Sequence, residues 1–198
     1  MFALVEDGSI TKYFSGNRGI TLGSNQYPKA IFTLWTKSER EAIGIYEVVW
    51  DNSNKKSEEW YVNTDVSYAF AGGKVTASYG SATAKAHADT LFTADDESNG
   101  LGTEGEVAVE GLKTIKIREV KRQAAGILAE TDWYIVRKAD AGTSVPSAIT
   151  NHRAAVRTKC AEMETAITNA SNTAAIETLY TRNAEGVRPI GDLPTLEV

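Results

Sequence analysis

The sequence predicts an α+β protein. A small N-terminal antiparallel β unit, made of hairpins and one short helix, is followed by a C-terminal antiparallel helical hairpin with a short third helix and an extended tail. Of the 17 aromatic residues, 14 precede residue 104, and aromatic residues favour strands. After residue 106, apolar residues recur at steps of three and four, as on one face of a helix. We therefore expect units at 1–88 and 107–182, an acidic, glycine-rich linker at 89–106 and a tail at 183–198.

Three β-hairpins are expected in the first unit, because runs of β-branched and aromatic residues are separated by turn residues. Asp7-Gly8 supplies the positive φ that a tight first turn needs. The expected strand pairs are Phe2–Val5 with Ile10–Phe14, Ile45–Trp50 with Trp60–Asn63, and Ser67–Phe70 with Lys74–Tyr79. Residues 15–25, rich in Gly, Ser and Asn, predict a loop. Thr36 and Glu39 fit a capping box that starts a short helix ending near Gly44.

Two long helices are expected in the second unit, joined by a flexible connection at 139–145. Their apolar stripes are Ile117, Val120, Ala124, Ile127, Leu128 and Thr131, and then Ile149, Val156, Cys160, Met163 and Ile167. Pro146 suits the first turn of the second helix. Arg153 interrupts the second stripe, which indicates either the end of the seam or a polar contact. A third helix is expected at about 173–182, and the tail is expected to need a partner surface to become ordered.

Composition and charge exclude several classes of protein. The net charge of −5 argues against a general nucleic-acid binder, because phosphate contacts need a concentrated positive field. The basic residues between Lys113 and Arg122 are expected to form a solvated face of a helix. No run approaches the ~18 consecutive apolar residues of a membrane span, and the opening residues lack the basic segment of a signal peptide. The single cysteine, Cys160, forms no internal disulfide and is consistent with a cytoplasmic environment.

The sharpest motif match is a calcium-binding loop. Asp95, Glu97, Asn99, Gly100 and Glu106 occupy positions one, three, five, six and twelve of the EF-hand pattern. Position three is usually Asp or Asn, and position eight, usually aliphatic, is Gly102. An acidic linker is the preferred interpretation, and a calcium loop is the alternative.

No catalytic constellation is visible, so we expect neither an enzyme nor a cofactor. The two histidines, His87 and His152, lack the neighbouring Cys or His residues of a metal site. Cys160 lies in an apolar stripe, where a thiol usually serves as a small hydrophobic side chain. A nucleophile, a base and a residue that orients the base do not occur together in any recognisable pattern.

The segment around Trp133 is the most informative for structure. Trp133 is expected to be a core residue that covers the open end of the helical hairpin. Asp132 is expected to accept a hydrogen bond from a loop amide or to pair with Arg153 or Arg157. Apolar residues left over after the hairpin closes are expected to contact partners. The candidates are Ile135, Tyr180, Leu193 and Leu196.

Two groups of residues carry a resemblance to a known family. The first comprises Lys121-Arg122, Ile127–Trp133, Pro146 and His152–Arg157, and the second comprises Phe2–Gly8, Lys12-Tyr13, Trp35-Thr36, Glu39-Arg40 and Ile43–Tyr46. Together they resemble the tail-assembly-chaperone and tail-fibre-assembly domains of tailed bacteriophages. Those domains share a helix ending in Leu-x-x-x-Asp-Trp, a loop with proline and a Tyr-Arg-x-x-[Leu/Val]-Arg helix. His152 stands where tyrosine is usual.

The resemblance implies a non-enzymatic structural protein. Such a protein is made in the host cytoplasm, resides in the virion tail, and docks in several copies to tail, tail-fibre or baseplate proteins, with no nucleic acid or membrane as partner. An alternative within the resemblance is a transient assembly chaperone that is absent from the mature virion. A different class, a free-standing calcium-dependent adaptor, depends on the loop at 95–106.

Overall fold

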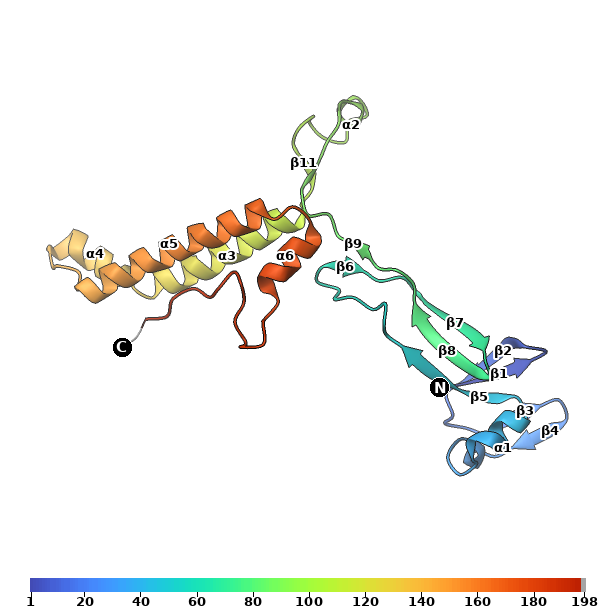
Figure 1. Ribbon diagram of the computed structural model, residues 1–198. Coiled ribbons are helices and arrows are strands. Elements are labelled where there is room, and N and C mark those ends of the chain that lie inside the picture. Colours follow the sequence, from blue (N-terminus) through green and yellow to red (C-terminus); the bar gives the residue numbers. More distant parts are fainter. Residues whose placement is uncertain (197–198) are drawn as a thin grey trace. The chain divides into compact units, whose positions relative to one another are not determined.

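The computed structural model describes residues 1–196, which form two compact units, one at Met1–Thr83 and a second that begins at Ala84. A β region precedes a helical region (Figure 1), so the α+β class is confirmed. The boundary lies before the expected linker. Residues 89–106 therefore belong to the second unit.

The first unit is built on a five-stranded sheet with one parallel pair, not on antiparallel hairpins alone. Its strands, in spatial order, are β2 (Ser9–Phe14), β1 (Phe2–Glu6), β5 (Ile45–Asp51), β8 (Lys74–Tyr79) and β7 (Val66–Ala71). The β1–β2 and β7–β8 hairpins are confirmed. The expected pairing of Ile45–Trp50 with Trp60–Asn63 is wrong, because β5 lies antiparallel to β1 and parallel to β8. Instead, β6 (Tyr61–Val62) pairs with β9 (Thr83–Ala84), where the first unit ends.

Apolar side chains pack on both faces of this sheet, because neighbouring residues of a strand point to opposite faces. Leu4 and Ile45 belong to one buried cluster, with Ile31 and Phe32 from η1 (Lys29–Phe32). The second cluster contains Ala3, Val48, Val75 and Ala77. The sheet is curled, and the rings of Tyr13 on β2 and Tyr68 on β7 lie 4.9 Å apart between centroids.

The first unit also contains a short helix and an additional hairpin. The capping box is confirmed at α1 (Lys37–Ala42), where the Thr36 amide donates to Glu39 at 2.7 Å and the Glu39 amide donates to the Thr36 hydroxyl at 3.3 Å. Residues 15–25, expected to be a loop, include β3 (Ile20–Leu22) and the start of β4 (Asn25–Tyr27). A tight turn at Gly23, with φ +56°, allows this extra hairpin.

The segment 89–106 is a folded hairpin rather than a linker. Strands β10 (Thr90–Leu91) and β11 (Val107–Val109) pair antiparallel and enclose the short helix α2 (Ala94–Ser98). The Phe92 amide donates to the Glu106 carbonyl at 2.9 Å, and the Gly105 amide donates to the Phe92 carbonyl at 3.0 Å. Gly102 lies against the Phe92 ring, where a Cβ would come within 2.4 Å of it. Local apolar packing therefore closes a segment whose composition is that of a linker.

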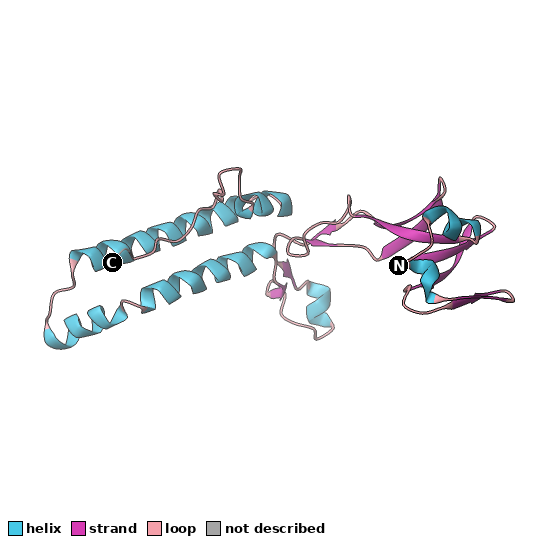
Figure 2. Cartoon of the chain, turned by 90° about the horizontal axis from the view of Figure 1, so that it is seen from below, coloured by secondary structure: helices cyan, strands magenta, loops and turns pink. Residues whose placement is uncertain are grey.

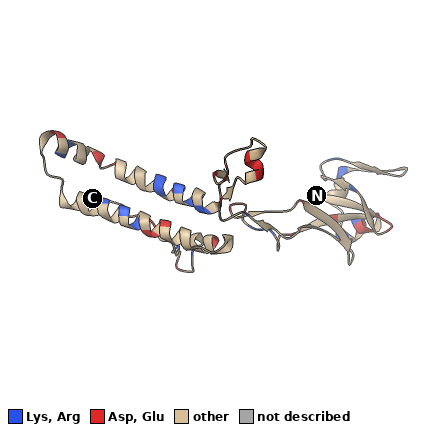
Figure 3. Ribbon diagram, turned by 90° about the horizontal axis from the view of Figure 1, so that it is seen from above, with Lys and Arg blue, Asp and Glu red and all other residues tan. Residues whose placement is uncertain are grey.

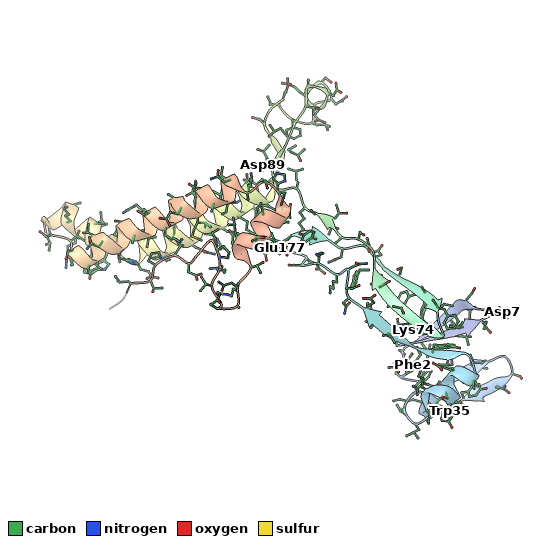
Figure 4. All side chains as sticks on the ribbon, in the orientation of Figure 1. Phe2, Asp7, Trp35, Lys74, Asp89 and Glu177 are labelled. Atoms are coloured by element: carbon green, nitrogen blue, oxygen red, sulfur yellow. The ribbon has the colours of Figure 1, made fainter. Side chains whose placement is uncertain are left out.

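Asp89 joins this hairpin to the start of α3 (Leu112–Ala129). The N-cap residue, Gly111, has no side chain to accept from the first amides of the helix, and the Leu112 and Lys113 amides donate instead to the Ala86 and His87 carbonyls at 2.9 and 3.0 Å. Asp89, 22 residues before Gly111, holds the same turn: its Oδ1 accepts from the Gly111 amide at 2.6 Å and its Oδ2 from the Thr114 hydroxyl at 2.8 Å. These two hydrogen bonds, the backbone bond first, hold the pKa of Asp89 below its ordinary value of 3.8. Figure 4 labels Asp89 at this junction.

We expect Asp89→Asn to lower the melting temperature of the second unit at pH 7. The lowered pKa means that the carboxylate stabilises the folded state above pH 3.8, and that this contribution is lost as the pH falls through the folded-state pKa. The difference between wild type and variant should therefore disappear in strong acid. Thermal unfolding followed by circular dichroism, at pH 7 and below pH 3, measures this difference in melting temperature. Asp95→Asn, an exposed change on α2, is the control. Equal melting temperatures at pH 7 would show that the hydrogen bonds of Asp89 do not stabilise the start of α3.

The second unit is built on two long helices that run antiparallel. The end of α3 meets the start of α5 (Ser147–Asn169) where Arg153 donates to the Leu128 carbonyl at 2.6 Å. The start of α3 meets the end of α5 where Lys113 donates to the Thr168 carbonyl at 2.8 Å. The connection differs from the expected loop, because α4 (Asp132–Ala141) lies between the two (Figure 1 and Figure 2). Gly142, with φ +68°, ends α4.

The C-terminal segment packs on its own chain. Ile190 is 3% exposed and shares a cluster with Val120, Met163 and Ile167. The Ile190 amide donates to the carbonyl of Leu179 in α6 (Thr173–Tyr180) at 3.0 Å. The expected need for a partner surface is therefore wrong for this part of the tail, because the second unit itself provides one. Residues 197–198 of the predicted tail lie outside the described residues.

Candidate interaction surface

Arg153 anchors the break between α3 and α4. Its side chain is buried, and one guanidinium nitrogen donates to the Leu128 carbonyl at 2.6 Å and to the Thr131 hydroxyl at 2.7 Å. Its second terminal nitrogen lies 2.8 Å from Asp132 Oδ1. The predicted ion pair of Asp132 with Arg153 is thus present, and Arg153 is the polar contact that its position in the apolar stripe indicated.

The charges of this anchor match the ends of the two helices. A cation is favourable beside the last carbonyls of α3, and a carboxylate is favourable in the first turn of α4. The buried hydroxyl of Thr131, between them, also donates to the Leu128 carbonyl at 3.1 Å. One guanidinium therefore bridges the last carbonyls of α3 and the first carboxylate of α4, and so orients α4 relative to α3.

Helix α4 presents apolar side chains outward, and none of its residues is buried. Trp133, Ile135 and Val136 are 51%, 43% and 64% exposed. At about 100° per residue, these three side chains cover roughly 160° of the helix circumference. We call them the α4 patch.

Trp133 is not the core residue that its position predicted. Its ring lies 3.8 Å from that of Tyr134 between centroids, and the Arg137 guanidinium lies 4.6 Å from the Trp133 ring. These contacts hold one face of the indole while half of the residue stays exposed. The sequence did not reveal this, because an aromatic residue at a helix end is compatible with either burial or display.

The remaining predicted contact residues are placed differently. Ile135 belongs to the α4 patch, but Tyr180 and Leu193 pack against the cluster around Ile190, and Leu196 is half-buried. Arg157 is exposed, and it donates to the Arg153 carbonyl at 3.4 Å. Val136 was not among the predicted contacts, although its spacing of three from Trp133 places both on one side of a helix.

The basic residues of α3 are largely matched by carboxylates. Lys116 lies 2.9 Å from Glu119, Lys121 lies 3.0 Å from Glu164 on α5, and Arg118 pairs with Glu110. Figure 3 shows both signs of charge along the helices. The helix therefore lacks the concentrated positive face that phosphate contacts need.

Cys160 is half-buried beside Glu164, and its thiol donates to Glu164 Oε1 at 3.3 Å. Burial, followed by this hydrogen bond to a carboxylate, raises the pKa of the thiol above its ordinary value. A raised pKa keeps the thiol protonated, and the thiolate is the nucleophilic form.

The calcium-loop residues do not form a shared site. Asp95 and Glu97 lie in α2, the Asn99 side chain donates to the Asp95 carbonyl at 2.7 Å, and Glu106 follows in the hairpin that encloses α2. Within residues 1–196, no three His, Cys, Asp or Glu side chains are grouped so that they could hold a metal ion. None of the helices in that same part of the chain has the length and apolar character to cross a membrane.

Comparisons of this chain with protein-family models, with curated proteins and with solved structures found no match.

Proposed function

We propose that this protein is a non-enzymatic component of a bacteriophage tail or tail fibre, which docks to other tail, tail-fibre or baseplate proteins in the virion. Two lines of argument support this proposal. The first is the resemblance carried by Leu128–Trp133 and His152–Arg157. The second is the α4 patch, whose three large apolar side chains are displayed on a helix with no buried residue. The patch is the observation that carries the proposal, because it lies in the same segment as the motif.

The chemistry of the patch suits a protein partner. Tryptophan and arginine are the residue types most enriched among those that dominate binding energy, and Arg137 is stacked on Trp133. An amphipathic helix of this kind docks by inserting its apolar side chains into a hydrophobic groove. The partner surface is expected to be an apolar groove with a carboxylate near Arg137.

The motif residues have a physical role in this proposal. Arg153, Thr131 and Asp132 fix α4 in one orientation before binding. A surface that is already ordered loses less conformational entropy on association. The Asp-Trp and Arg elements of the motif thus serve one surface: the first displays the aromatic residue and the second holds its helix.

We expect Trp133→Ser combined with Val136→Ser, introduced into the phage, to reduce the amount of this protein in purified particles. Loss of a central tryptophan contact commonly costs at least about 2 kcal/mol of binding free energy, roughly a 30-fold loss of affinity. Quantitative mass spectrometry of gradient-purified virions measures the copy number. Both side chains are exposed, so the melting temperature of the isolated protein should change little.

Val109→Ser is the matched control, because Val109 is 62% exposed in the same unit but lies on β11. It should leave the copy number unchanged. If the wild-type protein is absent from purified virions but bound to a tail protein in infected cells, the transient assembly chaperone replaces the structural role. If the double variant is incorporated like the wild type, the α4 patch is not the docking surface.

A further inference from the structure

The first unit contains a cavity whose lining suits an anion. The cavity has a volume of about 400 Å³ and lies between the end of β2 and the start of β3. Two cations, Lys12 and Arg18, contribute to the lining, and no carboxylate does so among residues 1–196. In a chain of net charge −5, two cations gathered without an acid form a local positive field, which attracts anions.

Both cations are available to a ligand. Within the described chain, neither Lys12 nor Arg18 forms an ion pair. The Lys12 ammonium lies over the Phe14 ring, 5.6 Å from its centroid. An arginine presents a planar fork of donors that matches the oxygens of a carboxylate or phosphate.

The loop that carries Arg18 is tightly packed. Gly16 has φ +78°, and a Cβ there would lie 3.0 Å from the Phe2 ring. A Cβ at Gly19 would lie 2.7 Å from the Tyr27 carbonyl oxygen. These contacts hold the loop against β1 and β4. Backbone amides of such a loop can add donors to those of the side chains.

The cavity also has an aromatic wall and is larger than a bare inorganic anion needs. Phe14 belongs to its lining and lies on the same side of β2 as Lys12, because alternate residues of a strand share a face. Ligand sites typically combine an apolar surface with a few placed polar groups in about 300–1,000 Å³. We propose that this cavity binds a small organic oxyanion, a phosphate or a carboxylate, with its charged group between Lys12 and Arg18 and its apolar part against Phe14.

The test uses the full-length, ¹⁵N-labelled protein titrated with phenyl phosphate, benzoate and neutral benzyl alcohol. Saturable shifts of the Gly16, Arg18 and Gly19 amides are expected with one or both anions and not with the alcohol. The two anions separate a phosphate site from a carboxylate site. Arg18→Gln and Lys12→Gln should each weaken binding about tenfold, because each removes a charge-assisted contact. Arg18→Lys should weaken it less, because the charge remains.

Lys55→Gln is the control, since Lys55 belongs to the same unit but lies over the Tyr79 ring rather than in the cavity. Unchanged peaks elsewhere in each spectrum show that the variants are folded. The proposal is overturned if neither anion produces saturable shifts at millimolar concentration, if benzyl alcohol shifts the same amides equally, or if Lys55→Gln weakens binding as much as Arg18→Gln.

Discussion

Arg153→Ala is expected to destabilise the second unit by about 2–4 kcal/mol. The substitution leaves the Leu128 carbonyl and the buried Thr131 hydroxyl without their charged donor, and hydrogen bonds to charged groups contribute about 1.5–3 kcal/mol each. The contact with Asp132 orients α4 but contributes little free energy, because the Asp132 side chain is 58% exposed and screened by solvent. Urea denaturation followed at 222 nm measures the loss, since the long helices lie in this unit.

Arg157→Ala is the matched control, one helical turn away on the same helix. Arg157 is exposed and its hydrogen bond to the Arg153 carbonyl is long, at 3.4 Å, so its removal should change the free energy of unfolding by no more than about 0.5 kcal/mol. Arg153→Lys should fall between the two, because an ammonium lacks the fork geometry that reaches three acceptors. If both alanine variants unfold at the same urea concentration, Arg153 does not anchor the helix junction.

Ile190→Ala is expected to destabilise the same unit by about 3 kcal/mol. Removing buried methyl groups costs their transfer free energy and leaves a cavity, and Ile→Ala changes typically cost 2–5 kcal/mol. Ile190 is 3% exposed against Val120, Met163 and Ile167. Deleting 183–198 should be at least as severe, because it also removes Leu193.

Val187→Ala provides the comparison, because Val187 lies three residues before Ile190 and is 55% exposed. It should leave the urea midpoint almost unchanged. This pair separates burial of one side chain from any general sensitivity of the C-terminal segment. If the Ile190→Ala variant is as stable as the wild-type protein, the C-terminal segment does not pack on the helices in solution.

Local patterns were sufficient for much of the fold. The capping box at Thr36, the hairpins at Asp7-Gly8 and Gly72-Gly73, and the apolar periods of α3 and α5 depend on residues within a few positions of one another. Such interactions act whatever the rest of the chain does. The polar contact at Arg153 was also predictable, because a cation in an apolar stripe needs a partner and Asp132 lies at the facing helix end.

Tertiary structure alone decided the features that join distant residues. One such feature is the parallel pairing of β5 with β8. The alternation of apolar and polar residues along β5 would suit another strand equally well, and the joint burial of Val48 and Val75, which lie opposite each other, favours β8. The composition of 89–106 does not reveal that Asp89 accepts hydrogen bonds from Gly111 and Thr114 at the start of a helix 22 residues onward. The tail is ordered by its own unit because Ile190 packs against Val120, Met163 and Ile167 of the two long helices.

Tertiary structure also decided that the Trp133 side chain is exposed. By itself, the sequence determined that a helix end, an acid and a tryptophan stand together, and that an arginine follows on the next long helix. Whether the indole closes the hairpin or faces outward depends on the direction of α4. That direction is set by three contacts of one guanidinium across two helix ends, a geometry that no local pattern encodes.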